Sequence, residues 1–166
     1  MTHTDKLMAI EEIKQLRARY FQCVDCKDWN GFLQVFAPDV EFDHVNSFRA
    51  VDPVSGASRI YGRPELLAGI DTRGWKMKGR DQIIANGAAQ FADVSTVHQG
   101  FNPQISIHSG DEASGIWAMQ DILRFPPPGP IQEIRGYGHY HETYRRIDGR
   151  WVIQTTTLKR LRIDVC

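Results

Sequence analysis

Three things are scarce in this 166-residue sequence: surplus charge of one sign, long apolar runs and cysteine. Lysine and arginine together number 20, and so do aspartate and glutamate, so no basic field exists to attract nucleic acid or an anionic membrane. No stretch approaches the roughly 20 apolar residues that a membrane helix needs. The first residues, M-T-H-T-D-K, lack the apolar core of a signal peptide. We therefore expect a cytoplasmic protein without nucleic-acid or membrane partners.

The three cysteines, Cys23, Cys26 and Cys166, are too few for a disulfide scaffold. Cys23 and Cys26 form a C-x-x-C pair, but a structural zinc site usually needs a second pair of ligands. A thioredoxin-like motif would follow a strand, whereas this pair lies inside a helical pattern. We interpret both residues as small side chains of a helix and expect neither a metal site nor a cofactor.

The first segment, over residues 5–27, is predicted to be a helix. Its apolar residues recur at three-to-four spacing, and its basic residues fall largely on the other side. Thr4 or Asp5 can cap its start. The apolar positions are Leu7, Ile10, Ile13, Leu16, Tyr20 and Val24, and the basic positions are Lys14, Arg17 and Arg19.

A second short helix is predicted after Asp28, which can cap it, and Pro38 closes it. The alternating stretch D-V-E-F-D-H-V indicates a strand. Residues 46–74 are rich in Gly, Pro, Ser and Arg and are predicted to form a long loop, with a turn of helix at P-E-L-L-A-G. A third helix is expected over residues 79–92.

The C-terminal part predicts four successive strands, over residues 94–107, 112–125, 133–147 and 150–163, separated by turn-forming segments. Helices followed by an antiparallel meander are typical of the α+β class. We expect one domain over residues 1–166, with helices packed on a strongly curved mixed or antiparallel sheet. Such a sheet closed by helices forms a cone-shaped pocket that suits a small molecule.

Five residues are candidates for chemistry. Tyr20 lies on the apolar face of the first helix, where a core tyrosine would also be ordinary. Asp25 lies near the end of that helix, where the helix dipole disfavours a negative charge. His98 occupies the middle of a strand in T-V-H-Q-G. Asp121 interrupts the otherwise apolar W-A-M-Q-D-I-L-R-F and needs a partner if buried. Its possible partners on the last strand are Arg160 and Arg162. These two residues lie on the same face of a strand, so the sequence does not choose between them.

Four stretches carry a family resemblance: I-E-E-I-K-Q-L-R-A-R-Y-F-Q-C-V-D-C-K-D-W, F-A-P-D-V-E-F, V-H-Q-G-F-N-P-Q-I-S-I and Y-R-R-I-D-G-R-W-V-I. They resemble the SnoaL-like branch of the nuclear-transport-factor-like cone fold, which includes scytalone dehydratase, ketosteroid isomerase and polyketide cyclases. The nearest resemblance is to the bile-acid 7α-dehydratases. Position by position, it implies a catalytic set at Tyr20, Asp25, His98, Asp121 and Arg160. The second histidine of those enzymes is replaced here by Phe101.

The resemblance implies a cofactor-independent dehydratase that acts on a hydrophobic multi-ring hydroxy-ketone, such as a steroid or bile acid, through an enolate. His98 would be the base, with Asp25 or Asp121 as its carboxylate partner, and Tyr20 would donate to the carbonyl oxygen. The alternatives are an isomerase, a polyketide cyclase or an epoxide hydrolase on the same scaffold, or a non-catalytic ligand-binding domain.

The expected substrate contacts are Trp117, Met119, Leu123, Tyr140, Phe101 and Asn102. Tyr137, His139 and His141 have the opposite parity to Tyr140, so only one of these sets can face the pocket. The family also implies a homo-oligomer, a trimer or a dimer. We expect Tyr144, Trp151 and Ile153 on the exposed sheet face that would mediate it.

Overall fold

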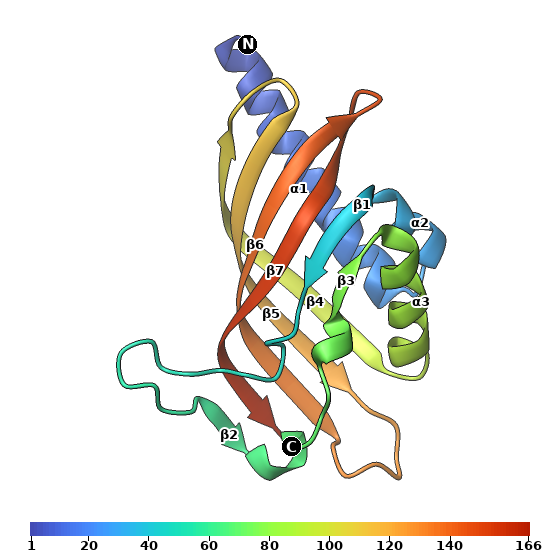
Figure 1. Ribbon diagram of the computed structural model, residues 1–166, viewed down its shortest axis with the longest axis vertical. Helices are drawn as coiled ribbons and strands as arrows, with labels where there is room; N and C mark the ends of the chain where they lie inside the picture. Colours follow the sequence, from blue (N-terminus) through green and yellow to red (C-terminus); the bar gives the residue numbers. More distant parts are fainter.

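The computed structural model describes all residues from Met1 to Cys166. It contains three α-helices and seven strands (Figure 1). The helices are α1 (His3–Asp25), α2 (Trp29–Gln34) and α3 (Arg80–Phe91). The strands are β1 (Phe36–Asp43), β2 (Ile60–Gly62), β3 (Lys76–Lys78), β4 (Ser95–Ile107), β5 (Glu112–Arg124), β6 (Glu133–Ile147) and β7 (Arg150–Val165). The predicted α+β class and the four-strand meander are confirmed.

All seven strands belong to one curled sheet with the order β3-β1-β7-β6-β5-β4, and β2 pairs with β7 outside this path. β1 and β2 run parallel to β7, and every other pairing is antiparallel. Helix α1 packs along β4 and β7, while α3 packs against β1 and α2 (Figure 1). The three helices therefore cover one face of the sheet.

Helix α1 begins earlier than predicted, because Thr2 and Asp5 form a capping box in which each side chain accepts a hydrogen bond from the backbone of the other. Leu7, expected on the buried side, is 61% exposed. The prediction that Arg17 lies on the polar side is wrong. Arg17 is fully buried, and its Nη1 lies 2.8 Å from Oε1 of Glu142 on β6. A partner on a distant strand cannot be predicted from the spacing of residues within the helix.

The second helix follows its prediction at the start, where the Asp28 carboxylate accepts a hydrogen bond from the backbone of Gly31. It ends at Gln34, and β1 already begins at Phe36 and runs through Pro38. The early end reflects pairing with β7, since the backbone of Ile153 donates to the carbonyl oxygen of Val35.

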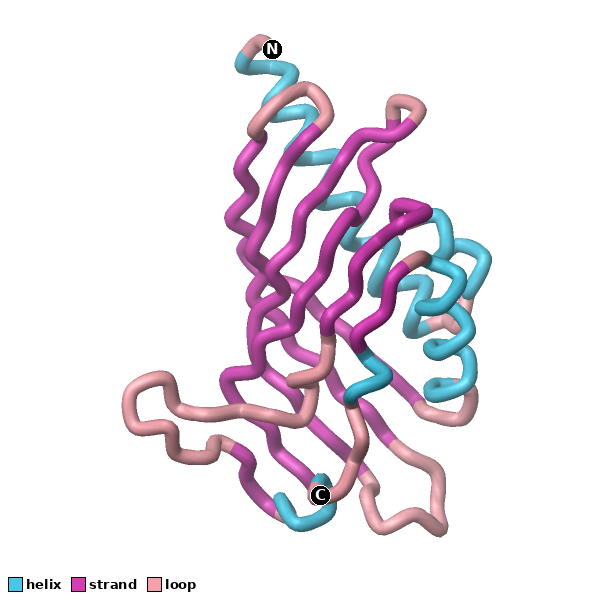
Figure 2. The backbone as a smooth tube through the Cα atoms, in the orientation of Figure 1, coloured by secondary structure: helices cyan, strands magenta, loops and turns pink.

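The loop predicted over residues 46–74 is partly ordered. Its 3-10 turn at Pro64–Leu67 confirms the predicted turn of helix, and a second 3-10 turn covers Arg73–Trp75. Strand β2 was missed because its pairing with β7 is non-local, with Ile60 opposite Ile163. Figure 2 shows the remaining loop between β1 and β2 extending away from the body of the sheet.

The strands of the meander alternate between a buried and a more exposed face, as the two-residue period predicts. Tyr140 faces inward, whereas Tyr137 and His139 lie on the other face. The expectation of an exposed oligomer surface built from Tyr144, Trp151 and Ile153 is wrong. These three side chains are buried: Tyr144 is 2%, Trp151 4% and Ile153 0% exposed. Homo-oligomerisation stays a prediction, but these side chains cannot mediate it.

Candidate active site

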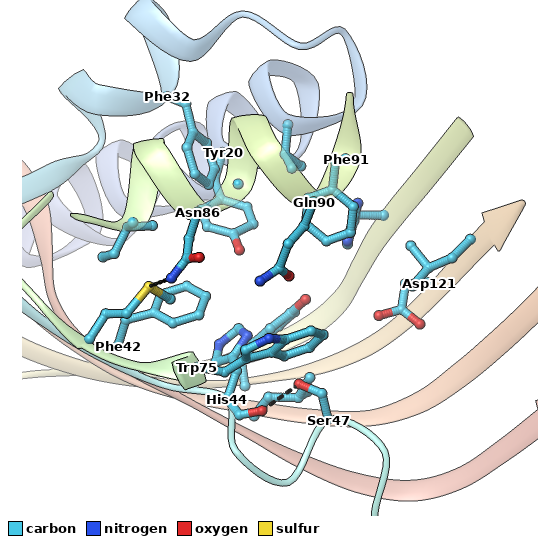
Figure 3. A pocket seen from close by; sticks show the side chains of 18 of the residues that line it. Tyr20, Phe32, Phe42, His44, Ser47, Trp75, Asn86, Gln90, Phe91 and Asp121 are labelled. Carbon is cyan, nitrogen blue, oxygen red and sulfur yellow. Dashed lines mark hydrogen bonds between the residues drawn. The ribbon is translucent and has the colours of Figure 1, made fainter. Parts of the chain in front are cut away.

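The cone encloses a cavity between α1, α2 and α3 on one side and the concave sheet on the other (Figure 3). The empty space between its walls, mouth included, is about 730 Å³. Thirteen of the 21 lining residues are hydrophobic, so an occupant is held mainly by apolar contact. The lining residues with side chains that can bind protons or donate hydrogen bonds are Tyr20, Trp29, His44, Ser47, Trp75, Asn86, Gln90, His98, Asp121, Tyr140 and Arg160.

Asp25 and His98 meet at the edge of this cavity. Oδ1 of Asp25, at the C-terminal end of α1, lies 2.7 Å from Nδ1 of His98 on β4. Oδ2 of the same carboxylate accepts a hydrogen bond of 2.8 Å from the backbone N–H of His98. The carboxylate thus fixes both the strand and the ring. Because Nδ1 is engaged by Asp25, the ring nitrogen left for a ligand is Nε2.

Thr96 also forms a hydrogen bond with the Asp25 carboxylate. Its hydroxyl donates to Oδ1 of Asp25 at 2.8 Å and accepts from Nζ of Lys27 at 3.1 Å. Lys27 has a left-handed backbone with φ of 59°, which is uncommon for a residue other than glycine. Partial burial lowers the pKa of its ammonium group. The chain Lys27–Thr96–Asp25–His98 therefore holds the carboxylate from two sides.

Asp121 and Arg160 form a separate, more deeply buried pair. The guanidinium of Arg160 donates Nη1–H to Oδ1 of Asp121 at 3.0 Å and Nη2–H to Oδ2 at 2.7 Å. Its Nε–H donates to the carbonyl oxygen of Ser47 at 3.0 Å. Arg160 reaches across β6 at Gly136, where an added Cβ would overlap both Nη1 of Arg160 and Oδ1 of Asp121. Glycine is required there by space, a constraint that sequence reasoning missed.

Tyr20 points into the cavity from α1 (Figure 3). Burial raises the pKa of its phenol to about 12, with Arg17 opposing part of the rise, so the hydroxyl stays protonated at neutral pH. The Cζ atom of Arg17 lies 3.9 Å from the ring centroids of both Tyr20 and Tyr140. The ion pair of Arg17 with Glu142 and these two ring contacts fix the phenol in place.

Sequence reasoning missed six lining residues with polar groups, which are Trp29, His44, Ser47, Trp75, Asn86 and Gln90. His44 directly follows β1, and its parity with Val40 and Phe42 could have indicated an inward side chain. Asn86 and Gln90 lie four residues apart on α3, a spacing that places them on one helix face. Figure 3 shows both amides directed into the cavity, with Trp75 on the opposite side.

The six expected substrate contacts divide into three groups. Leu123 and Tyr140 line the cavity. Trp117 and Met119 are buried beyond it, where the Trp117 indole donates to the hydroxyl of Tyr144 and the Met119 sulfur contacts Arg160. Phe101 pairs with Ala118 on the outer face of the sheet and is 43% exposed. Asn102 is also exposed and has φ of 41° at a register shift in β4.

The C-x-x-C pair stands apart from this site. Cys23 is buried, Cys26 is exposed, and neither forms a disulfide. The Cys23 sulfur lies 3.8 Å from the Asp28 carboxylate. Burial is the largest cause that raises the pKa of the thiol, and the charge and hydrogen bond of Asp28 raise it further.

The helices of the protein include none that is long and apolar enough to cross a membrane.

Comparison with known proteins places the site in a family. The chain matches the SnoaL-like domain family over residues 5–157. The probable cyclase FGR4 of Gibberella zeae is 22% identical over 149 residues, which cover 90% of this chain and 89% of that protein. A candidate scytalone dehydratase from Novosphingobium aromaticivorans DSM 12444 superposes with a TM-score of 0.72 at 19% identity, over 98% of this chain and 90% of that chain.

A further solved structure is the hexachlorocyclohexane dehydrochlorinase LinA-type3 from Novosphingobium barchaimii LL02. It superposes with a TM-score of 0.72 at 16% identity, over 99% of this chain and 94% of that chain. At such identities the solved structures establish the fold, and the family match covers most of the sequence. The chain therefore belongs to the SnoaL-like domain family and has the nuclear-transport-factor-like cone fold.

Proposed function

We propose that the protein is a cofactor-independent dehydratase that acts on a hydrophobic multi-ring hydroxy-ketone of the steroid or bile-acid kind. The observation that carries the proposal is the 2.7 Å contact between Asp25 and Nδ1 of His98 at the wall of an apolar cavity. A carboxylate on one ring nitrogen orients the imidazole and favours the tautomer whose other nitrogen accepts a proton. A non-catalytic binding domain has no need for this arrangement.

The reaction begins with removal of a proton from the carbon next to the substrate carbonyl by Nε2 of His98. The electron pair of the broken C–H bond moves onto the carbonyl oxygen, which becomes an enolate. When the enolate collapses, the electron pair returns through the conjugated system and the C–O bond of the hydroxyl group breaks. The imidazolium of His98 then supplies the proton with which the departing hydroxide leaves as water. Protons and electrons balance without a cofactor.

Tyr20 is the donor to the carbonyl oxygen in this proposal. A hydroxyl that stays protonated at neutral pH can donate a hydrogen bond that strengthens as negative charge develops. The Asp121–Arg160 pair is internally neutralised and contributes to the polarity of the wall. The mainly apolar lining suits a hydrophobic substrate such as a molecule of several fused rings.

The test is a panel of hydroxylated steroids and hydroxy-enones followed by ultraviolet absorbance, because dehydration extends conjugation. His98→Ala should lower kcat/KM by roughly 10²- to 10⁴-fold while the protein remains folded. His108→Ala is the matched control, since His108 is exposed, directly follows β4 and does not line the cavity. Activity of His98→Ala within threefold of the unaltered protein would contradict the assignment of the base.

A second candidate is an isomerase or cyclase that uses the same enolisation without a leaving group. The relative named as a probable cyclase favours it, since that relative covers 90% of this chain. Mass spectrometry of the product separates the two candidates. A dehydratase product has lost one water, whereas an isomerised or cyclised product keeps the mass of its substrate.

A further inference from the structure

His44 is a cavity residue that the proposed chemistry does not yet use. Its backbone is fixed, because its N–H donates to the carbonyl oxygen of Trp75 at 3.0 Å and its own carbonyl oxygen accepts from the hydroxyl of Ser47 at 2.7 Å. Its ring packs on Phe42 with centroids 3.7 Å apart and lies 5.8 Å from the ring of Tyr140. The imidazole is therefore held in one place at the cavity wall.

The Nε2 atom of His44 is buried and has no hydrogen-bond partner in the protein. Eight buried side-chain nitrogen and oxygen atoms share this condition, and among them only Nε2 of His44 belongs to a residue that lines the cavity. A buried polar atom without a partner is unfavourable and calls for an explanation. A phenylalanine would make the same ring contacts without this penalty, so packing alone does not account for a histidine here.

The surroundings of His44 keep its ring uncharged. Burial is the largest cause that lowers the pKa of His44 well below its ordinary value, and the positive charges of Arg17 on α1 and Arg160 on β7 act in the same direction. Tyr140 on β6 is the remaining titratable contact, and its phenol is neutral because burial raises its pKa. A neutral imidazole carries one N–H donor, and such a group can polarise a carbonyl oxygen without giving up its proton.

We propose that His44 is a second hydrogen-bond donor to the substrate oxygen on which negative charge develops, opposite the hydroxyl of Tyr20. Figure 3 shows the Tyr20 hydroxyl directed across the cavity toward the side on which His44 and Trp75 lie. An oxygen between the two side chains would give the imidazole of His44 the hydrogen-bond partner that the protein itself does not supply. This inference rests on the proposed function, in that it assigns the substrate a ketone oxygen, and it adds His44 to the catalytic residues.

The test compares His44→Phe, which keeps the ring contacts and removes the donor, with His44→Gln, which restores an N–H donor. His44→Phe should lower kcat/KM by roughly 10²- to 10³-fold, the effect of losing one donor to an oxyanion. His44→Gln should recover at least tenfold of that loss. His139→Phe, on the outer face of β6, is the matched control and should leave kcat/KM unchanged.

A second measurement does not depend on turnover. A saturated steroid ketone that lacks the hydroxyl leaving group, labelled with carbon-13 at its carbonyl, is bound to each variant and its infrared carbonyl band recorded. The band should lie at lower frequency than in water for the unaltered protein and for His98→Ala. In His44→Phe a large part of that shift should be lost.

The outcomes separate the two proposals. An identical carbonyl band in His44→Phe and the unaltered protein would overturn the role of His44, whatever the activity of His98→Ala. A band that responds to His44→Phe, together with unimpaired turnover in His98→Ala, would support the oxygen site and refute the assigned base. Failure of the labelled ketone to bind at all would overturn the role of His44, because no ketone oxygen would then reach it.

Discussion

Asp25, at the edge of the cavity beside His98, and Asp121, in the cavity wall, are two carboxylates with opposite surroundings. His98 lies directly opposite Asp121 in the register of β4 and β5, yet its ring pairs with Asp25 from the helix. The Asp121 side chain is 4% exposed and shares two hydrogen bonds with a permanent cation, Arg160. The Asp25 side chain is 22% exposed and contacts a ring that can change its charge. A fixed cation makes a carboxylate structural, whereas a titratable partner makes it available for proton transfer.

The sharpest way to break this comparison is to replace each aspartate by asparagine. Asp25→Asn removes the charge and can place an N–H donor against Nδ1 of His98, which would favour the tautomer that carries its proton on Nε2. The nitrogen that faces the ligand then cannot accept a proton. We expect kcat/KM to fall by roughly 10²- to 10⁴-fold. The free energy of unfolding, measured with denaturant, should change by less than about 1.5 kcal/mol because Asp25 is partly exposed.

Asp25→Glu serves as the control, since it keeps the charge and displaces the carboxylate by one methylene. It should retain more activity than Asp25→Asn. Equal activity of Asp25→Asn and the unaltered protein would show that the Asp25–His98 contact is structural only.

Asp121→Asn should have the reverse effect. It leaves the guanidinium of Arg160 buried without a counter-charge, and breaking a buried ion pair by removing one partner costs about 3–5 kcal/mol. We expect the midpoint of denaturant unfolding to fall accordingly. The matched control is Asp164→Asn, which breaks an ion pair with the exposed Arg162 and should cost less than about 1 kcal/mol. Similar losses in the two variants would remove the contrast between the carboxylates.

The sequence located much of this site and failed at identifiable points. The two-residue period correctly placed Asp121 on the buried face of β5. The same period could not choose between Arg160 and Arg162, because they share a parity. The structure separates them by a bulge: Gly138 pairs with Arg160 and the preceding Tyr137 with Arg162, so Leu161 is an extra residue on β7. A bulge inverts the alternation of side chains beyond it, and the local sequence does not predict where one occurs.

Arg17 was missed for a different reason, because its position depends on Glu142, a partner far away in the chain. The inward position of His44 could have been predicted from the period of β1, but the α1 and β7 cations that lower its pKa could not. Helical spacing suggested that a basic residue faces solvent, and it cannot register a buried acid on another element. By contrast, the resemblance to dehydratases indicated Asp25 and His98 as site residues, and the structure brings their side chains into contact. Local sequence patterns thus predicted the helices and strands, whereas the partners of the buried charges could be identified only in the folded structure.

The smallest effect that we predict concerns the two cavity histidines. In the unfolded chain the imidazole of His44 binds a proton below about pH 6.5, whereas in the folded protein burial and nearby cations lower its pKa well below that value. Between these two pKa values the unfolded state binds more protons than the folded state, so stability rises with pH. The contribution of His44 is complete above about pH 6.5 and is lost as the pH falls toward its folded pKa.

The loss should approach about 1.4 kcal/mol per pH unit, the slope for one proton. It is measured as the difference in unfolding free energy between the unaltered protein and His44→Phe, from pH 7.5 down to about pH 4.5. Carboxylates with a lowered pKa, such as Asp71 beside Arg73, reduce the stability only at lower pH. Their effect is the same in both proteins, so it cancels when the two unfolding free energies are subtracted. A difference that stays constant over this range would mean that His44 titrates alike in both states. His98→Ala keeps His44 in place and should therefore keep the acid-side loss that His44→Phe removes. The two histidines of one cavity would then be distinguished by what surrounds them, in the same way as the two aspartates.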